Sequence, residues 1–135
     1  MNAPEIIVTR SDLERLGHLM EWHATARDHL AVEYLENELS RARVVNPSDV
    51  PTTVVTMNSR FRYVDCSTGQ ARTATLVYPT DADAASGKLS VLAPVGCALL
   101  GLAVGQTIEW PLPGGQVRRF RIDEILYQPE AAGES

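Results

Sequence analysis

Residues 90–115, SVLAPVGCALLGLAVGQTIEWPLPGG, form the most strongly patterned stretch of the chain and decide its predicted fold. Pro94 suits the first position of a helix, where the N–H that proline lacks is not needed. Apolar side chains then recur at the spacing of one helix face, at Val95, Ala98, Leu99 and Leu102. This spacing predicts a short amphipathic helix that begins at Pro94.

The second half of the stretch predicts a turn, a strand and another turn. Gly101 and Gly105 are candidates for the end of the helix and the following turn, because glycine adopts positive φ freely. Gln106–Leu112 then alternates, which predicts a strand with one apolar face at Ile108, Trp110 and Leu112. The segment 113–115 ends this strand. We therefore expect a short helix set against a curved antiparallel sheet.

Outward from this unit, the C-terminal part of the chain alternates with the period of a sheet. Strands are predicted over Val54–Val64, Gln70–Tyr78, Lys88–Leu92 and Gln116–Tyr127. In the last of these the apolar positions change phase near Asp123 and Glu124, which predicts a β-bulge there.

The N-terminal part has the period of helices instead. Ile6–Val8 predicts a short lead-in strand or anchor, and Ser11 to Glu14 reads as a capping box that starts a first helix. Asp28 is a plausible N-cap of a second helix. Two narrow apolar stripes with a short connection predict an antiparallel hairpin. The polar segment 46–51 marks a boundary between domains 1–50 and 51–135. The predicted fold class is α+β.

Composition limits the function classes. The 135 residues carry a formal net charge of −5, and the first 50 residues hold nine acidic and five basic side chains. General binding to nucleic-acid phosphates needs a basic surface, so we expect no direct nucleic-acid binding. No apolar run has the length of a membrane span, and the first ten residues lack a signal pattern. We expect a cytoplasmic protein in which Cys66 and Cys97 are reduced.

Catalytic and metal-binding motifs are not recognisable. Gly101 to Gly105 precedes a strand and lacks the Gly-Lys-Ser/Thr of a phosphate loop. The three histidines, at positions 18, 23 and 29, are five and six residues apart, whereas metal ligands on one helix face are four apart. We therefore expect no metal and no cofactor. The residues alone indicate an acidic two-part protein without a visible active site.

Several separated motifs in one order resemble a known family. The 90–115 pattern is similar to the C-terminal domain of the Gre-type transcript cleavage factors, which has an FKBP-like fold. The more specific resemblance is to the regulator of nucleoside diphosphate kinase (Rnk) family. It rests on VVTMNS at 54–59, TLVYP at 75–79, APVG at 93–96 and YQPEAAG at 127–133. Together these motifs cover nearly the whole chain.

The resemblance implies a function and two candidate sites. It implies a non-catalytic regulator that binds RNA polymerase as a monomer at the rim of the secondary channel, competes with Gre factors there, and influences nucleoside diphosphate kinase. The loop that docks Gre proteins on the polymerase corresponds to Val91, Leu92, Ala93 and Pro94. Asp28 is the residue that matches the metal-holding aspartate at the tip of the Gre coiled-coil hairpin.

Alternatives remain open at each site. For Asp28 the preferred interpretation is an N-cap of its own helix, and Ala31 stands where a Gre factor has its second carboxylate. An active cleavage factor would need both carboxylates to hold a magnesium ion. Leu92 and Pro94 have a purely structural interpretation as well as a docking one. A peptidyl-prolyl isomerase of FKBP type would need an aromatic pocket, and the few aromatic residues of the predicted sheet are explained as core.

Overall fold

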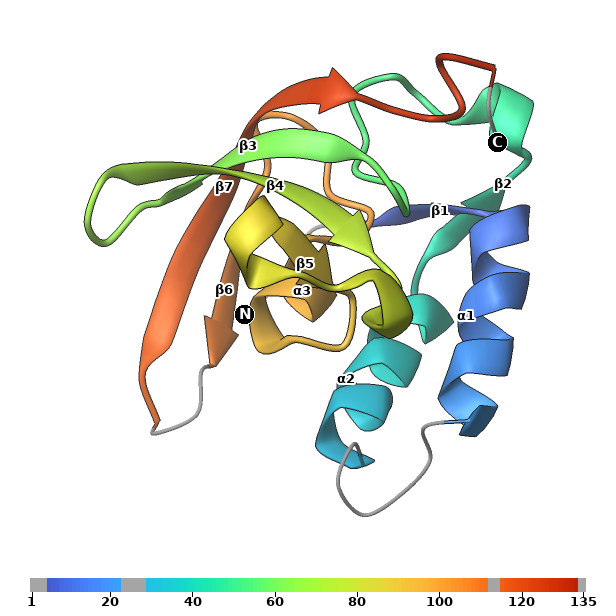
Figure 1. The fold of residues 1–135 in the computed structure, drawn as a ribbon, viewed down its shortest axis with the longest axis horizontal. Coiled ribbons are helices and arrows are strands. Elements are labelled where there is room, and N and C mark those ends of the chain that lie inside the picture. The colour runs from blue at the N-terminus through green and yellow to red at the C-terminus, as the bar shows by residue number, and fades with distance from the viewer. Residues whose placement is uncertain (1–4, 23–28, 112–114, 134–135) are drawn as a thin grey trace.

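The computed structural model describes residues 5–22, 29–111 and 115–133. A five-stranded sheet curls around a short central helix, and two longer helices lie together on one side of it (Figure 1). In chain order the main elements are β1 (Ile7–Thr9), α1 (Arg10–Trp22), α2 (His29–Ser40), β2 (Arg43–Val45), β3 (Arg60–Asp65), β4 (Gln70–Val77), β5 (Lys88–Ser90), α3 (Pro94–Leu99), β6 (Thr107–Pro111) and β7 (Val117–Tyr127). The mixed α+β class is confirmed.

The large sheet has the strand order β5-β4-β3-β7-β6. Its neighbours are antiparallel except for β4 and β5, which run parallel, so the prediction of a purely antiparallel sheet is wrong at this edge. The reason is the connection between them. Two single turns of 3-10 helix, η2 (Pro79–Asp81) and η3 (Ala84–Ser86), return the chain to the level of Thr75 before β5 begins.

β3 begins six residues later than the predicted strand Val54–Val64. Residues 54–57 are four consecutive buried residues, whereas a strand with one exposed face would alternate. The chain turns here instead of extending. The Ser59 Oγ accepts a hydrogen bond from the Thr56 N–H at 2.9 Å, which closes the turn just before β3.

β7 contains the irregularity that its apolar phase predicts. Opposite β3, Ile122 pairs with Tyr63 but Glu124 pairs with Arg62, so Asp123 is an extra residue. A second extra residue, Leu126, follows before Tyr127. The predicted bulge near Asp123 and Glu124 is confirmed. It lets Ile125 pack against the core that also contains Phe120 and Ile122, whereas Tyr127 is 40% exposed.

The N-terminal part begins with β1, which pairs in parallel with β2. α1 starts at Arg10, and the Thr9 Oγ1 accepts the Asp12 N–H at 3.1 Å. Thr9 is therefore the N-cap, and the predicted capping box starting at Ser11 is wrong by two residues. Thr9 serves because β1 brings it, fully buried, to the helix start. The predicted second cap, Asp28, lies outside the described residues.

One apolar core joins the two long helices to the sheet. Leu16 of α1 and Leu35 of α2 belong to the same buried cluster as Phe61, Leu76 and Leu99. The Tyr34 ring of α2 also lies 5.3 Å from the Trp110 ring of β6. The turn η1 (Pro47–Asp49) lies at the predicted boundary near residue 50, and the division into two domains stays a prediction. Among the described helices, none is both long and apolar enough to cross a membrane.

Leu99 tests the packing of α3 against the sheet, because its side chain is fully buried. We expect Leu99→Ala to lower the free energy of unfolding by about 2–5 kcal/mol, through lost apolar contact and the cavity left behind. Urea denaturation measures the change. Leu126→Ala is the matched control, since Leu126 is 40% exposed. An unchanged midpoint for Leu99→Ala would contradict this packing.

Candidate functional site

The loop that precedes α3 is held by a tight turn at Ser90. The Ser90 Oγ accepts the Leu92 N–H, and the Ser90 carbonyl accepts the Ala93 N–H, both at 3.0 Å. The Val91 N–H donates to the Val77 carbonyl of β4 at 2.9 Å. The backbone N–H groups of Val91, Leu92 and Ala93 are therefore all hydrogen-bonded. Because these bonds fix the backbone, the loop has one defined shape.

Helix α3 packs closely against this loop. A Cβ atom at Gly96 would lie 2.0 Å from the Ser90 carbonyl oxygen, so no larger residue fits there without moving the backbone. The Cys97 thiol donates to the Val91 carbonyl at 2.9 Å. Burial, followed by the nearby Glu38 charge, raises the pKa of Cys97 to about 12. This thiol therefore stays protonated and serves as a structural donor.

Exposure divides the four predicted docking residues. The Val91 side chain is fully buried in the core, whereas Leu92 and Ala93 are half-buried. The side chain of Pro94 is not described. Of the described side chains in this loop, only Leu92 and Ala93 can offer surface to a partner.

An open groove adjoins the loop. It has a volume of about 610 Å³ and is bounded by Ser90 and Ala93 at one end. Tyr63 of β3, Arg72 of β4 and Lys88 of β5 are among the other residues that line it. A partner that contacts Ala93 would therefore lie next to this groove.

A second constellation, which the sequence did not predict, lies where α1 meets the sheet. The buried Asp12 carboxylate accepts the Met57 backbone N–H at 3.0 Å. The Thr56 hydroxyl donates to the Glu130 carboxylate at 2.7 Å, which ties the C-terminal segment to the same turn. We call Asp12, Thr56, Met57, Tyr78 and Glu130 the polar junction.

Burial shifts the acid groups of the polar junction. It is the largest cause that raises the pKa of Asp12 to about 6, against the lowering effect of the Met57 N–H. Burial, and then the Asp12 charge, raises the pKa of Tyr78 to about 12. The Tyr78 hydroxyl has no hydrogen bond of acceptable geometry within the described residues, although the Arg15 guanidinium lies close enough to oppose this rise. The junction thus combines the buried Asp12, Thr56 and Met57 with the half-buried Tyr78 and Glu130, and burial raises the pKa of its Asp12 carboxyl to about 6.

Two family models match the chain along its length. The model of the Rnk N-terminus matches residues 4–45, and that of the C-terminal region of the GreA/GreB transcription elongation factors matches residues 50–127. The regulator of nucleoside diphosphate kinase of Escherichia coli K12 is 46% identical over 134 residues, which are 99% of this chain and 98% of that protein. This chain belongs to the Rnk family.

Further similarities connect this Rnk-family chain to the GreA/GreB factors. The transcription elongation factor GreA of Methylobacterium sp. (strain 4-46) is 33% identical over 94% of this chain and 84% of its own length. A solved GreA/GreB-type elongation factor from Nitrosomonas europaea is 49% identical, with a TM-score of 0.72 over 92% of this chain and 99% of that one. The GreA/GreB-like fold is therefore shown.

Three of the four motifs that resemble the Rnk family meet at the polar junction. VVTMNS supplies Thr56 and Met57, TLVYP supplies Tyr78, and YQPEAAG supplies Glu130. Gln128 of the last motif donates to the Pro51 and Val54 carbonyls, each at 2.9 Å. The motifs were therefore a usable signal for this cluster. Asp12 gave no such signal, because it lies in none of them.

The hairpin tip cannot be placed in the same way. Asp28 and His23 lie outside the described residues. Across residues 5–22, 29–111 and 115–133, no three His, Cys, Asp or Glu side chains are grouped closely enough to hold a metal ion.

The raised pKa of Asp12 predicts a pH dependence of stability. A carboxyl whose pKa rises from 3.8 in the unfolded chain to about 6 in the folded chain favours folding at low pH, and this contribution is lost as pH increases through 6. Asp12→Asn keeps an oxygen that can accept the Met57 N–H but removes the titration. We expect the stability of the variant relative to wild type to increase by about 2 kcal/mol between pH 4 and pH 7.

Chemical denaturation at a series of pH values measures this difference. Asp12→Ala is the control, because it leaves the Met57 N–H buried without an acceptor and should destabilise the protein across the whole range. Parallel curves for wild type and Asp12→Asn would show that Asp12 does not titrate in this window.

Proposed function

We propose that this protein is a non-catalytic regulator of transcription that binds RNA polymerase and competes with Gre-type factors for the secondary channel. The observation that carries the proposal is the rigid loop at 90–94, within the region that matches the GreA/GreB C-terminal model. The E. coli relative is named a regulator of nucleoside diphosphate kinase, and we propose the same regulatory target here.

The loop has the properties of a docking element. Its backbone is fixed by Ser90 and by the close approach of Gly96, so little conformational entropy is lost on binding. The half-buried Leu92 offers an apolar contact that needs no rearrangement of the core. Apolar contacts of this kind form the centre of many protein interfaces. We propose that Leu92, Ala93 and Pro94 contact the polymerase and that Val91 anchors them.

The helices support a role without catalysis. Within the described residues α1 has 13 residues and α2 has 12, so each is about 20 Å long at 1.5 Å per residue. Ala31, where a second carboxylate would be needed, is half-buried in the first turn of α2, and its carbonyl lies 3.9 Å from the Cys97 thiol of α3. We propose that α1 and α2 act as a short counterpart of the Gre coiled-coil hairpin that blocks the channel entrance without delivering a metal ion.

A backtracked elongation complex incubated with a Gre factor and magnesium tests the proposal. Excess protein should inhibit the Gre-stimulated cleavage and release no short 3′ fragments by itself. Leu92→Asp should weaken this inhibition at least about tenfold, because an unpaired charge is costly in an apolar contact. Val117→Asp, at a 62% exposed position outside the loop, is the matched control and should inhibit like wild type.

Three results would count against the account. Fragment release above the background of the polymerase would show a catalytic factor. Full inhibition by a normally folded Leu92→Asp variant would move the contact away from the loop. Cleavage gained by Ala31→Glu would show that the helices reach the catalytic centre and that only a carboxylate is missing.

A further inference from the structure

β4 extends beyond its neighbour at the edge of the sheet. It spans Gln70–Val77, but β5 pairs only with Thr75 to Val77. Residues 70–74 therefore have β3 on one side and, within the described part of the chain, no strand on the other.

The backbone of this segment points outward at two residues. Leu76 exchanges hydrogen bonds with Ser59 and Asn58 on the β3 side, whereas the Thr75 N–H donates to the Gly87 carbonyl on the opposite side. Because successive residues alternate, the N–H and C=O groups of Ala71 and Thr73 also point away from β3. No hydrogen bond from the described residues reaches these four groups. The backbone of Gly87 lies next to the Thr73 carbonyl oxygen, so the two groups of Ala71 and the Thr73 N–H are the accessible ones. Unpaired backbone groups at the edge of a sheet can form hydrogen bonds with an added strand.

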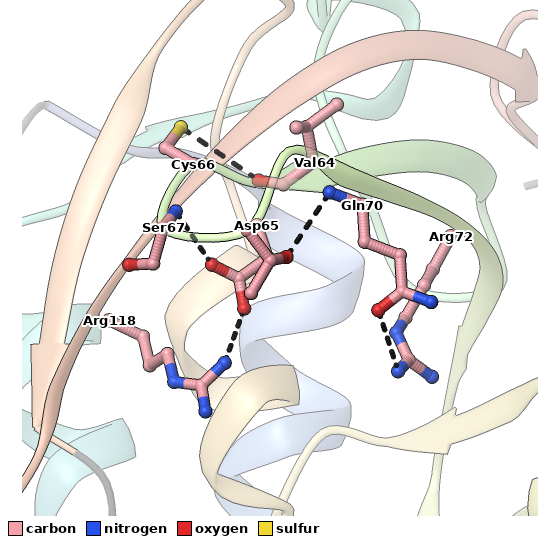
Figure 2. Close-up of polar contacts among 8 residues, drawn as sticks. Val64, Asp65, Cys66, Ser67, Gln70, Arg72 and Arg118 are labelled. Atoms are coloured by element: carbon pink, nitrogen blue, oxygen red, sulfur yellow. Dashed lines mark hydrogen bonds and ion pairs between the residues drawn. The ribbon is translucent and has the colours of Figure 1, made fainter.

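The turn that leads into β4 is stiff (Figure 2). The Asp65 carboxylate accepts the Ser67 N–H at 2.9 Å and the Arg118 guanidinium at 2.6 Å. The Asp65 carbonyl also accepts the Gly69 N–H at 2.7 Å. Arg118 comes from β7, so the end of the β3–β4 hairpin is tied to the strand on the other side of β3. The free edge is therefore preorganised, which lowers the entropy lost when a partner strand pairs with it.

Hollows lie on both sides of the free edge. The groove of about 610 Å³ contains Tyr63 and Arg72 from the concave face of the sheet. A second hollow, of about 420 Å³, contains Arg60 and Thr75 from the convex face. The two hollows share Thr73, Ala74 and the facing Gly87. Side chains of an added strand would alternate between them.

The charge of both hollows is positive. Arg72 and Lys88 line the first, and Arg60 lines the second. The acidic side chain there, Asp83, is engaged by the Ala85 N–H and the Ser86 hydroxyl. An incoming strand with acidic side chains would therefore meet a cation on either face.

We propose that residues 70–74 of β4 accept an extended acidic peptide segment of a partner protein as an additional strand. Main-chain hydrogen bonds to Ala71 and Thr73 supply affinity, and the cations on both faces select acidic side chains. This surface borders the proposed polymerase contact, since Ser90 and Ala93 line the same groove as Arg72. The two proposals are nevertheless tested separately, because the test of this one uses no polymerase.

A fluorescent peptide, Thr-Val-Thr-Glu-Glu-Val-Thr-Val, probes the edge in anisotropy titrations with the full chain. Its adjacent glutamates point to opposite faces when extended. We expect saturable binding, weakened at least tenfold by N-methylation of alternate peptide bonds in the probe or by replacing its glutamates with glutamine. Arg72→Glu combined with Lys88→Glu should weaken binding to a similar degree. Arg43→Glu, an exposed charge reversal on β2, should leave binding unchanged.

Thr73→Pro removes one outward N–H that no described residue uses, and it should also weaken binding. Equal binding of the parent and N-methylated probes would overturn the proposal, since only charge attraction would remain. Absence of saturable binding at low salt would overturn it as well. Displacement of the probe by a ten-thymidine oligonucleotide that binds more tightly would assign the edge to nucleic acid instead.

Discussion

The arrangement of helix α1 relative to the large sheet depends on one constraint. This constraint is the hydrogen bond from the Met57 N–H to the buried Asp12 carboxylate. It joins the first turn of α1 to the turn that precedes β3, across 45 residues of sequence. A buried charge is costly, and here the raised pKa of Asp12 records that cost. The bond persists because removing the acceptor would leave the Met57 N–H unpaired inside the core.

From this bond the rest of the packing follows. Leu16 of α1 enters the same core cluster as Leu99 of α3, and α2 lies against α3 near Cys97. Cys97 in turn holds the Val91 carbonyl, which fixes the loop before α3. Ser90 and Ala93 of that loop border the same groove as Arg72 at the free edge of β4. The predicted docking loop and the proposed strand-binding edge thus border the same groove.

Local sequence patterns predicted the elements that depend on local forces. The helix at Pro94, the strand from Gln70 and the bulge near Asp123 follow from proline, alternation and a change of phase, which are visible within ten residues. The consecutive burial of residues 54–57 was missed because segments distant in sequence cover both faces of that turn. The parallel pairing of β5 was missed because it depends on the path of residues 78–87 and not on the composition of the strand.

The candidate site also combines features that local sequence predicts with features that depend on segments distant in sequence. The loop 91–94 was predictable from its motif, but the burial of Val91 and the contact of Gly96 with Ser90 require the three-dimensional path. Asp12 lies within a plausible capping pattern, and no neighbouring residue indicates that its carboxylate accepts the Met57 N–H. Long-range pairing of a single polar residue leaves no periodic signal in a sequence.

The most direct test of this account is the pH titration of the Met57 amide by ¹H–¹⁵N nuclear magnetic resonance. A hydrogen bond to a titrating carboxylate predicts a large change of the Met57 amide shift, with a midpoint near pH 6 that disappears in Asp12→Asn. A Met57 amide that does not titrate, or that follows a midpoint near the ordinary aspartate value of about 4, would contradict the buried link between α1 and the sheet.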